Sequence, residues 1–116
     1  MAFSEFELKQ IETAAKDFEQ LRRPPAHIRP ELDVRWYIQG QSVIVSEYRP
    51  IWNNPTEIQE YPSAKATYVK SRKHWKLYWM RRDLKWHRYD ENNETHRFIQ
   101  DVFNIIHVDR YGCFFG

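Results

Sequence analysis

PSAKATYVKSRKHWKLYWMRRDLKWHRY, residues 62–89, is the segment from which the rest of the fold follows. It carries nine Lys or Arg and one acid, Asp83, so its net charge is +8, whereas the whole chain carries +2. Six aromatic residues are interleaved with that charge. Alternation of side-chain character, broken by polar turns at 71–73 and 82–83, predicts three short antiparallel strands.

The alternation also assigns faces to these strands. The row Trp75, Leu77 and Trp79 is predicted to be core. The opposite row is predicted to form a polar, basic face, made of Lys65, Lys76, Tyr78, Lys85 and His87.

Residues 31–39 and 42–49 flank Gly40 and predict a hairpin of two further strands. Within the first of these, Arg35 and Tyr37 point away from the apolar row. They would extend the basic face if the two hairpins join edge to edge. The stretch 50–62, rich in Asn and Pro, is predicted to be a loop between them.

One helix is predicted before the first strand and a second helix after the last strand. The first begins at a capping box of Ser4 and Glu7 and ends before Pro24. The second follows a polar break with N-cap candidates Asn92 and Asn93, and runs to about His107. Its predicted buried residues are Phe98, Ile99, Val102, Ile105 and Ile106. The apolar tail YGCFFG is expected to dock on the body.

The fold class that follows is α+β: an N-terminal helix, a mostly antiparallel five-stranded sheet and a C-terminal helix, with both helices on one sheet face. At 116 residues the chain is predicted to be a single domain, 1–116. Hydrophobic residues make up 41% of it and aromatic residues 16%, which suffices for a compact core.

Composition excludes several classes of protein. A single cysteine, Cys113, excludes an intramolecular disulfide framework and a multi-cysteine zinc site. Acids at Glu5 and Glu7, with no apolar region behind them, argue against a signal peptide. Apolar runs are too short for a membrane span, so a cytoplasmic protein is expected. No glycine-rich phosphate loop occurs, and no cofactor or metal is predicted.

Several segments together resemble a known family. They are FSEFELKQIE, RRPPAHIRPELD, SEYRPIW, KATYVKSRKHWKLYW, LKWHRYD and the terminal CFFG. The chain resembles, over essentially its whole length, a bacterial family of small proteins described only as a domain of unknown function (DUF3024-like). The resemblance implies a free-standing bacterial cytoplasmic protein and assigns no role to any residue.

The leading functional hypothesis is a non-enzymatic binding module. Lysine and arginine attract phosphates and exposed rings stack on bases, so the basic face suits single-stranded nucleic acid or another polyanion. The competing interpretation is an ordinary solvated sheet face, on which lysines guard against aggregation.

Two alternatives remain open. Asp33 with Glu47-Tyr48-Arg49 is similar to the carboxylate pattern of a metal-dependent nuclease, although Arg49 cannot act as a base. The other alternative is a protein-interaction or homodimerisation module, because exposed aromatic residues are typical of binding hot spots. Its candidate residues are Trp52, Phe114 and Phe115.

Overall fold

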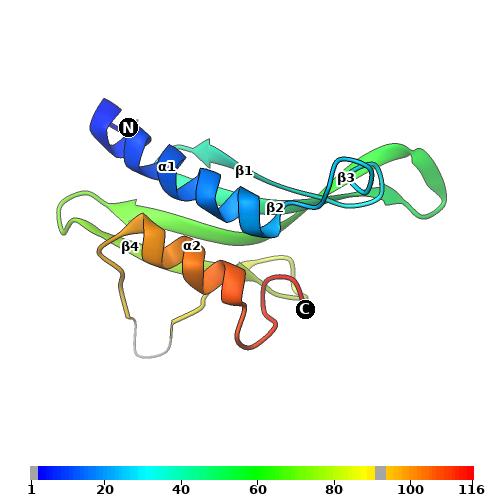
Figure 1. Cartoon of the computed structure of the whole chain (residues 1–116). Coiled ribbons are helices and arrows are strands. Elements are labelled where there is room, and N and C mark those ends of the chain that lie inside the picture. The colour runs from blue at the N-terminus through cyan, green and yellow to red at the C-terminus, as the bar shows by residue number, and fades with distance from the viewer. Residues whose placement is uncertain (1–2, 91–93) are drawn as a thin grey trace.

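In a computed structural model, which describes residues 3–90 and 94–116, the chain forms two helices and one five-stranded sheet (Figure 1). Their order is α1 (Glu5–Arg22), β1 (Asp33–Gln39), β2 (Ser42–Ile51), β3 (Asn54–Val69), β4 (His74–Met80), β5 (Trp86–Arg88) and α2 (Ile99–Val108). Each strand pairs antiparallel with the next along the chain. Both helices cover the same sheet face, and the predicted fold class is confirmed.

Helix α1 begins as the sequence indicates. Glu7 N donates to Ser4 Oγ at 3.2 Å, and Ser4 N donates to Glu7 Oε1 at 2.9 Å, which completes the capping box. The helix ends at Arg22, two residues before Pro24. Neither of the helices within the described residues is long and apolar enough to cross a membrane.

The core lies between the helices and one face of the sheet. Trp75 and Leu77 are buried there and Trp79 is half-buried, which confirms the predicted core row. Ala64 and Ala66 on β3 are buried opposite Trp79 and Leu77, so the bulky side chains of β4 lie beside small neighbours. The helices add a matching apolar stripe, made of Ile11, Ala14, Ala15, Phe18, Ile99, Val102, Phe103 and Ile106.

The predicted loop at 50–62 is wrong. Strand β2 continues to Ile51, Trp52 and Asn53 form a turn, and β3 starts at Asn54 and runs for 16 residues. This long hairpin projects beyond the helices (Figure 1). Side chains near its tip are mostly exposed, so no apolar alternation marks it in the sequence.

Helix α2 starts later than predicted, and Phe98 is not buried. It is the N-cap residue, has an extended backbone, and its side chain is 57% exposed because it lies outside the helical stripe. Asn92 and Asn93, the predicted caps, lie outside the described residues. After the helix, Asp109 Oδ1 and Oδ2 accept hydrogen bonds from the backbone N–H groups of Phe114 and Phe115. The predicted docking of the tail is therefore confirmed.

Candidate nucleic-acid interface on the open sheet face

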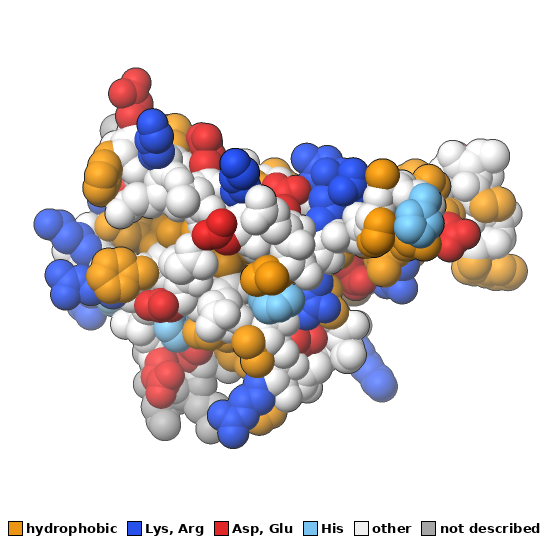
Figure 2. Space-filling view, in the orientation of Figure 1, with side chains coloured by type: hydrophobic (Ala, Val, Ile, Leu, Met, Phe, Trp, Pro, Cys, Tyr) orange, Lys and Arg blue, Asp and Glu red, His pale blue; other side chains and the backbone are white. Residues whose placement is uncertain are grey.

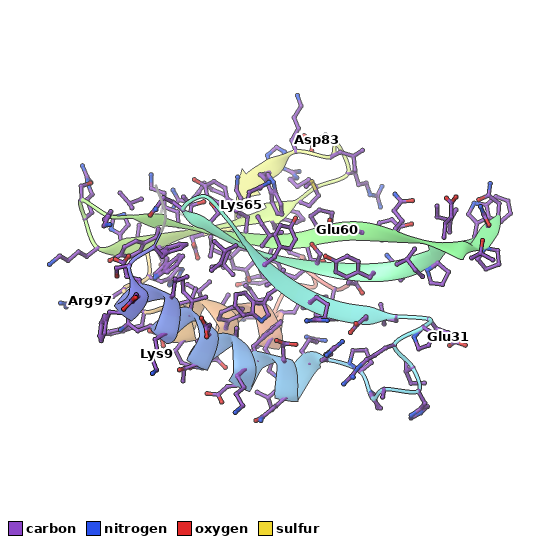
Figure 3. The ribbon with its side chains drawn as sticks, turned by 90° about the horizontal axis from the view of Figure 1, so that it is seen from above. Lys9, Glu31, Glu60, Lys65, Asp83 and Arg97 are labelled. Atoms are coloured by element: carbon purple, nitrogen blue, oxygen red, sulfur yellow. The ribbon has the colours of Figure 1, made fainter. Side chains whose placement is uncertain are left out.

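The sheet face that neither helix covers is organised by one row of directly paired residues. Tyr37, Ile44, Lys65, Tyr78 and Arg88 succeed one another across β1 to β5. Residues directly opposite each other in an antiparallel ladder share a face. Figure 3 shows Lys65 on the side of the ribbon away from the helices. This row therefore brings two cations and two tyrosines onto the open face.

Lys65 and Arg88 both approach the ring of Tyr78. Lys65 Nζ lies 5.0 Å from the Tyr78 ring centroid and 5.3 Å from that of Trp86. Arg88 Cζ lies 5.8 Å from the Tyr78 centroid. Such cation–π contacts hold long, flexible side chains close to the sheet. The open face of β3, β4 and β5 thus carries aromatic rings and cations in contact.

A hollow of about 500 Å³ lies beside this row, lined by Val69, Arg72, His74, Lys76, Arg88 and Thr95. Arg88 Nη2 donates to the carbonyl oxygen of Glu94 at 2.7 Å, whereas Arg88 Nε is buried without a hydrogen-bond partner in the described part of the chain. A buried donor without an acceptor is costly. An anionic oxygen in the hollow would supply one.

The β1–β2 side of the open face is a closed polar network instead. Ser46 Oγ donates to Glu60 Oε2 at 2.6 Å, and Ser46 is fully buried. Burial, reinforced by the hydrogen bond with Glu60, raises the pKa of Tyr37 to about 12. Ile44 is 2% exposed although it faces away from the helices. The acid Glu60, on β3 opposite Tyr48, places negative charge here, so the basic surface is confined to β4, β5 and the part of β3 that pairs with β4.

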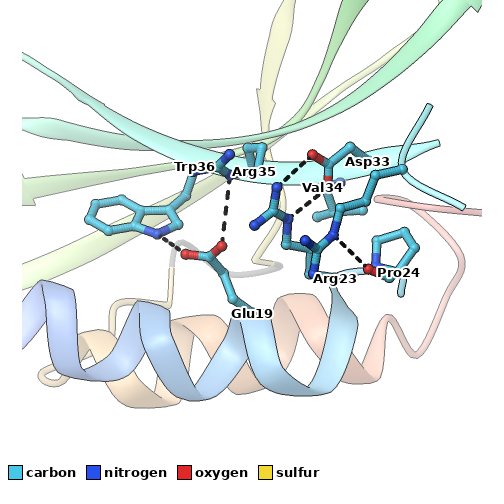
Figure 4. Close-up of polar contacts among 8 residues, drawn as sticks. Glu19, Arg23, Pro24, Asp33, Val34, Arg35 and Trp36 are labelled. Carbon is cyan, nitrogen blue, oxygen red and sulfur yellow. Dashed lines mark hydrogen bonds and ion pairs between the residues drawn. The ribbon is translucent and has the colours of Figure 1, made fainter. Parts of the chain in front are cut away.

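Of the residues predicted for the basic face, Lys65, Lys76 and Tyr78 lie together. Tyr37 shares their face by register, inside the polar network of β1 and β2. Arg35 lies at the sheet edge, where its Nε is 3.7 Å from Glu19 Oε2 of α1 (Figure 4). Arg35 therefore takes part in attaching α1 to β1.

His87 and Lys85 do not lie on this face with the others. His87 pairs with Trp79, which puts it on the helix-covered side, and its Nε2 is 2.8 Å from Asp83 Oδ2. Lys85 precedes β5 and is exposed in the β4–β5 connection. Trp86 and Arg88 occupy the open face instead, because a shift of one residue exchanges the two faces of a strand.

The nuclease pattern does not assemble. Asp33 pairs with Tyr48, whereas Glu47 pairs with Val34, so the two carboxylates belong to opposite faces. Arg23 donates from Nε and Nη2 to the two oxygens of Asp33, each at 2.9 Å (Figure 4), and this contact lowers the pKa of Asp33. Burial raises the pKa of Glu47. Among the described residues no group of three or more His, Cys, Asp or Glu could hold a metal ion.

The three residues predicted for protein interaction have different surroundings. Phe114 is buried against Tyr89, with 4.8 Å between ring centroids. Phe115 lies under Arg22, whose Cζ is 4.3 Å from the ring centroid. Both rings therefore contact residues of the same chain. Trp52, at the tip of the β2–β3 hairpin, is 92% exposed.

Comparison with protein families matches residues 3–116 to the model described as "Domain of unknown function (DUF3024)". No curated protein and no solved structure matches the chain.

Proposed function

The chain belongs to the DUF3024 family, described as a domain of unknown function, and from its open sheet face we propose that it binds single-stranded nucleic acid. The observation that carries this proposal is the row of Lys65, Tyr78 and Arg88 on β3, β4 and β5. Lys76 and Arg72 extend the positive charge beside it. A groove of cations that track phosphates, with rings on which bases stack, is the common design of single-strand binders.

The aromatic residues favour a single strand over a duplex. A base can stack on a side chain only where it is not already stacked in a helix. The Lys65 side chain now rests against Tyr78, and a phosphate would draw its ammonium group away from the ring. Arg88 is held by its hydrogen bond to the carbonyl oxygen of Glu94, so a base would take the place that Lys65 leaves.

Salt-dependent retention on a single-stranded DNA oligonucleotide tests the proposal. The double variant Lys65→Glu, Lys76→Glu reverses two charges on the open face. The matched control, Lys9→Glu with Lys16→Glu, makes the same change of net charge on exposed residues of α1. We expect only the first to lose retention, with the log–log salt slope falling by roughly 0.7 for each phosphate that the variant no longer neutralises. Equal retention by both variants would reject this face.

A second candidate function, protein interaction or homodimerisation, is supported by the β2–β3 hairpin. Its tip presents Trp52 and the 57% exposed Ile58, and Figure 2 shows hydrophobic side chains at this projecting end. Strand β4 pairs with β3 only from Ala64 onward, so the rest of that edge carries unpaired backbone groups. Light scattering over a dilution series tests it: a dimer that Trp52→Ala dissociates supports the hypothesis, and a monomer at every concentration contradicts self-association.

A further inference from the structure

A second, larger hollow lies between the N-terminal parts of α1 and α2, on the helix-covered side of the sheet. Its volume is about 660 Å³, and Ile11, Ala14 and Trp75 contribute to its lining. Phe6 from α1 and Phe98 beside α2 also line it. The hollow is therefore a groove whose apolar surface continues from the core out to the molecular surface.

The two phenylalanines lie largely outside the core, and Phe98 is contacted by Arg97, whose Cζ is 6.0 Å from its ring centroid. Phe6 is 73% exposed and Phe98 is 57% exposed, although the apolar core residues of both helices lie close by. Exposed apolar residues gathered at one concave site are typical of ligand-binding grooves. A ligand with an apolar body would cover both rings and remove them from water.

The same groove is bordered by three cations, Lys9, Lys73 and Arg97. Figure 3 shows Lys9 and Arg97 at the same end of the molecule. In the described part of the chain none of the three forms a salt bridge. The one acid in the lining, Glu7, already accepts a hydrogen bond from Ser4 N in the capping box. The charge at the rim is therefore complementary to an anion.

We infer that this groove binds an amphiphilic monocarboxylate, a molecule with a flexible apolar chain and one carboxylate, of the fatty-acid class. The chain would lie between Phe6 and Phe98, and the carboxylate would lie among the three cations. The volume falls in the range of about 300–1,000 Å³ that small-molecule sites occupy. A protein partner would bury a much larger surface than this hollow offers. The inference is independent of the nucleic-acid proposal, because the two sites lie on opposite sides of the sheet.

Octanoate is a suitable probe and 1-octanol is its matched neutral analogue. In amide NMR titrations of the full chain we expect octanoate to shift resonances of Ile11, Ala14 and Ile99, and to bind more tightly than 1-octanol. The double variant Lys9→Glu, Arg97→Glu should weaken octanoate binding on the order of tenfold, since each exposed ion pair contributes up to about fivefold. The control Lys16→Glu, Lys85→Glu carries the same charge change outside the groove and should bind normally.

Phe98→Ala tests the apolar part of the site. Because Phe98 is mostly exposed, its removal leaves the fold intact and should weaken octanoate and 1-octanol alike. The inference is overturned if octanoate shifts only resonances outside the groove, or if 1-octanol binds as tightly as octanoate. It is also overturned if an acidic, apolar peptide saturates the same resonances at lower concentration, which would assign the groove to a protein partner.

Discussion

Lys65 lies directly opposite Tyr78 across the β3–β4 ladder, with its Nζ 5.0 Å from the ring centroid. The contact joins a cation and an aromatic ring on the face that no helix covers. Arg88 approaches the same ring from β5. The pairing register therefore turns a basic, aromatic segment of sequence into one surface on which charge and rings are neighbours.

Tyr78→Ala should weaken binding to single-stranded DNA by about 1–3 kcal/mol, the usual contribution of one stacked base. The loss should persist at high salt, because stacking, unlike attraction to phosphates, is not screened. Fluorescence anisotropy at two salt concentrations measures it. Tyr111→Ala, which removes an exposed tyrosine elsewhere, is the control. Indistinguishable affinities for the two variants would argue against a base on Tyr78.

Leu77→Ala should lower the free energy of unfolding by about 2–5 kcal/mol, because Leu77 is fully buried between the sheet and the helices. Urea unfolding followed by circular dichroism gives the value. Leu21→Ala, at a side chain in the last turn of α1 that is 67% exposed, should cost far less. Similar losses in both variants would show that Leu77 is not at the centre of the core.

Most of the fold could be predicted from the sequence because each predicted element has two different sides. The apolar stripe of α1 and the alternation in β1 and β4 both reflect one buried face and one wet face. The outer half of the β2–β3 hairpin has mostly exposed side chains. Without a buried face it leaves no period-two signal, and Pro55 and Pro62 suggest a loop.

The candidate site could be predicted only in part, because the sequence does not determine the pairing register of β5. Lys65, Lys76 and Tyr78 lie on strands whose core rows are obvious, so their open face follows directly. Strand β5 has only three residues, and nothing in its sequence fixes which side meets the core. The predicted face of His87 is therefore the reverse of the one in the structure. The groove between α1 and α2 has no sequence signal, because it depends on how two helices meet.

The His96–Asp90 pair should make stability depend on pH. His96 Nε2 is 3.0 Å from Asp90 Oδ2, and this hydrogen bond raises the pKa of His96 against the opposing effect of burial. Stabilisation is then complete below the unfolded-state pKa of about 6.5 and is lost as pH rises through the higher folded value.

Urea unfolding of wild type and His96→Gln between acidic and alkaline pH measures this dependence. The difference in unfolding free energy should be largest at acidic pH and shrink as pH rises. His27→Gln, which changes an exposed histidine before β1, should show no such trend. A difference that grows with pH would mean that the imidazole is held neutral.

Leu84→Gly should raise the free energy of unfolding by up to about 1 kcal/mol. Leu84 has φ of 60° in the β4–β5 connection, a left-handed conformation that costs a residue with a Cβ roughly 1–2 kcal/mol. Its side chain is 80% exposed, so little packing is lost with it. Part of the gain is offset by the extra freedom of glycine in the unfolded chain. Leu84→Ala, which keeps the Cβ, should not stabilise, and a stabilising alanine would contradict the backbone explanation.

Asp109 should be required for docking of the C-terminal tail. Its backbone is left-handed, with φ of 46°, and its carboxylate accepts hydrogen bonds from Phe114 N at 3.0 Å and Phe115 N at 2.9 Å. Asp109→Ala loses both hydrogen bonds and keeps the strained backbone, so we expect about 2–3 kcal/mol of destabilisation in urea. The tail should then be cut more readily by protease.

Two further variants separate the backbone of Asp109 from its carboxylate. Asp109→Gly relieves the left-handed strain but removes both acceptor oxygens. In Asp109→Asn, asparagine adopts the left-handed backbone readily and keeps one acceptor oxygen. If the hydrogen bonds hold the tail, Asn should be more stable than Gly, and Gly more stable than Ala. A glycine variant as stable as wild type would show that Asp109 serves only to end α2, and that burial of Phe114 is sufficient to dock the tail.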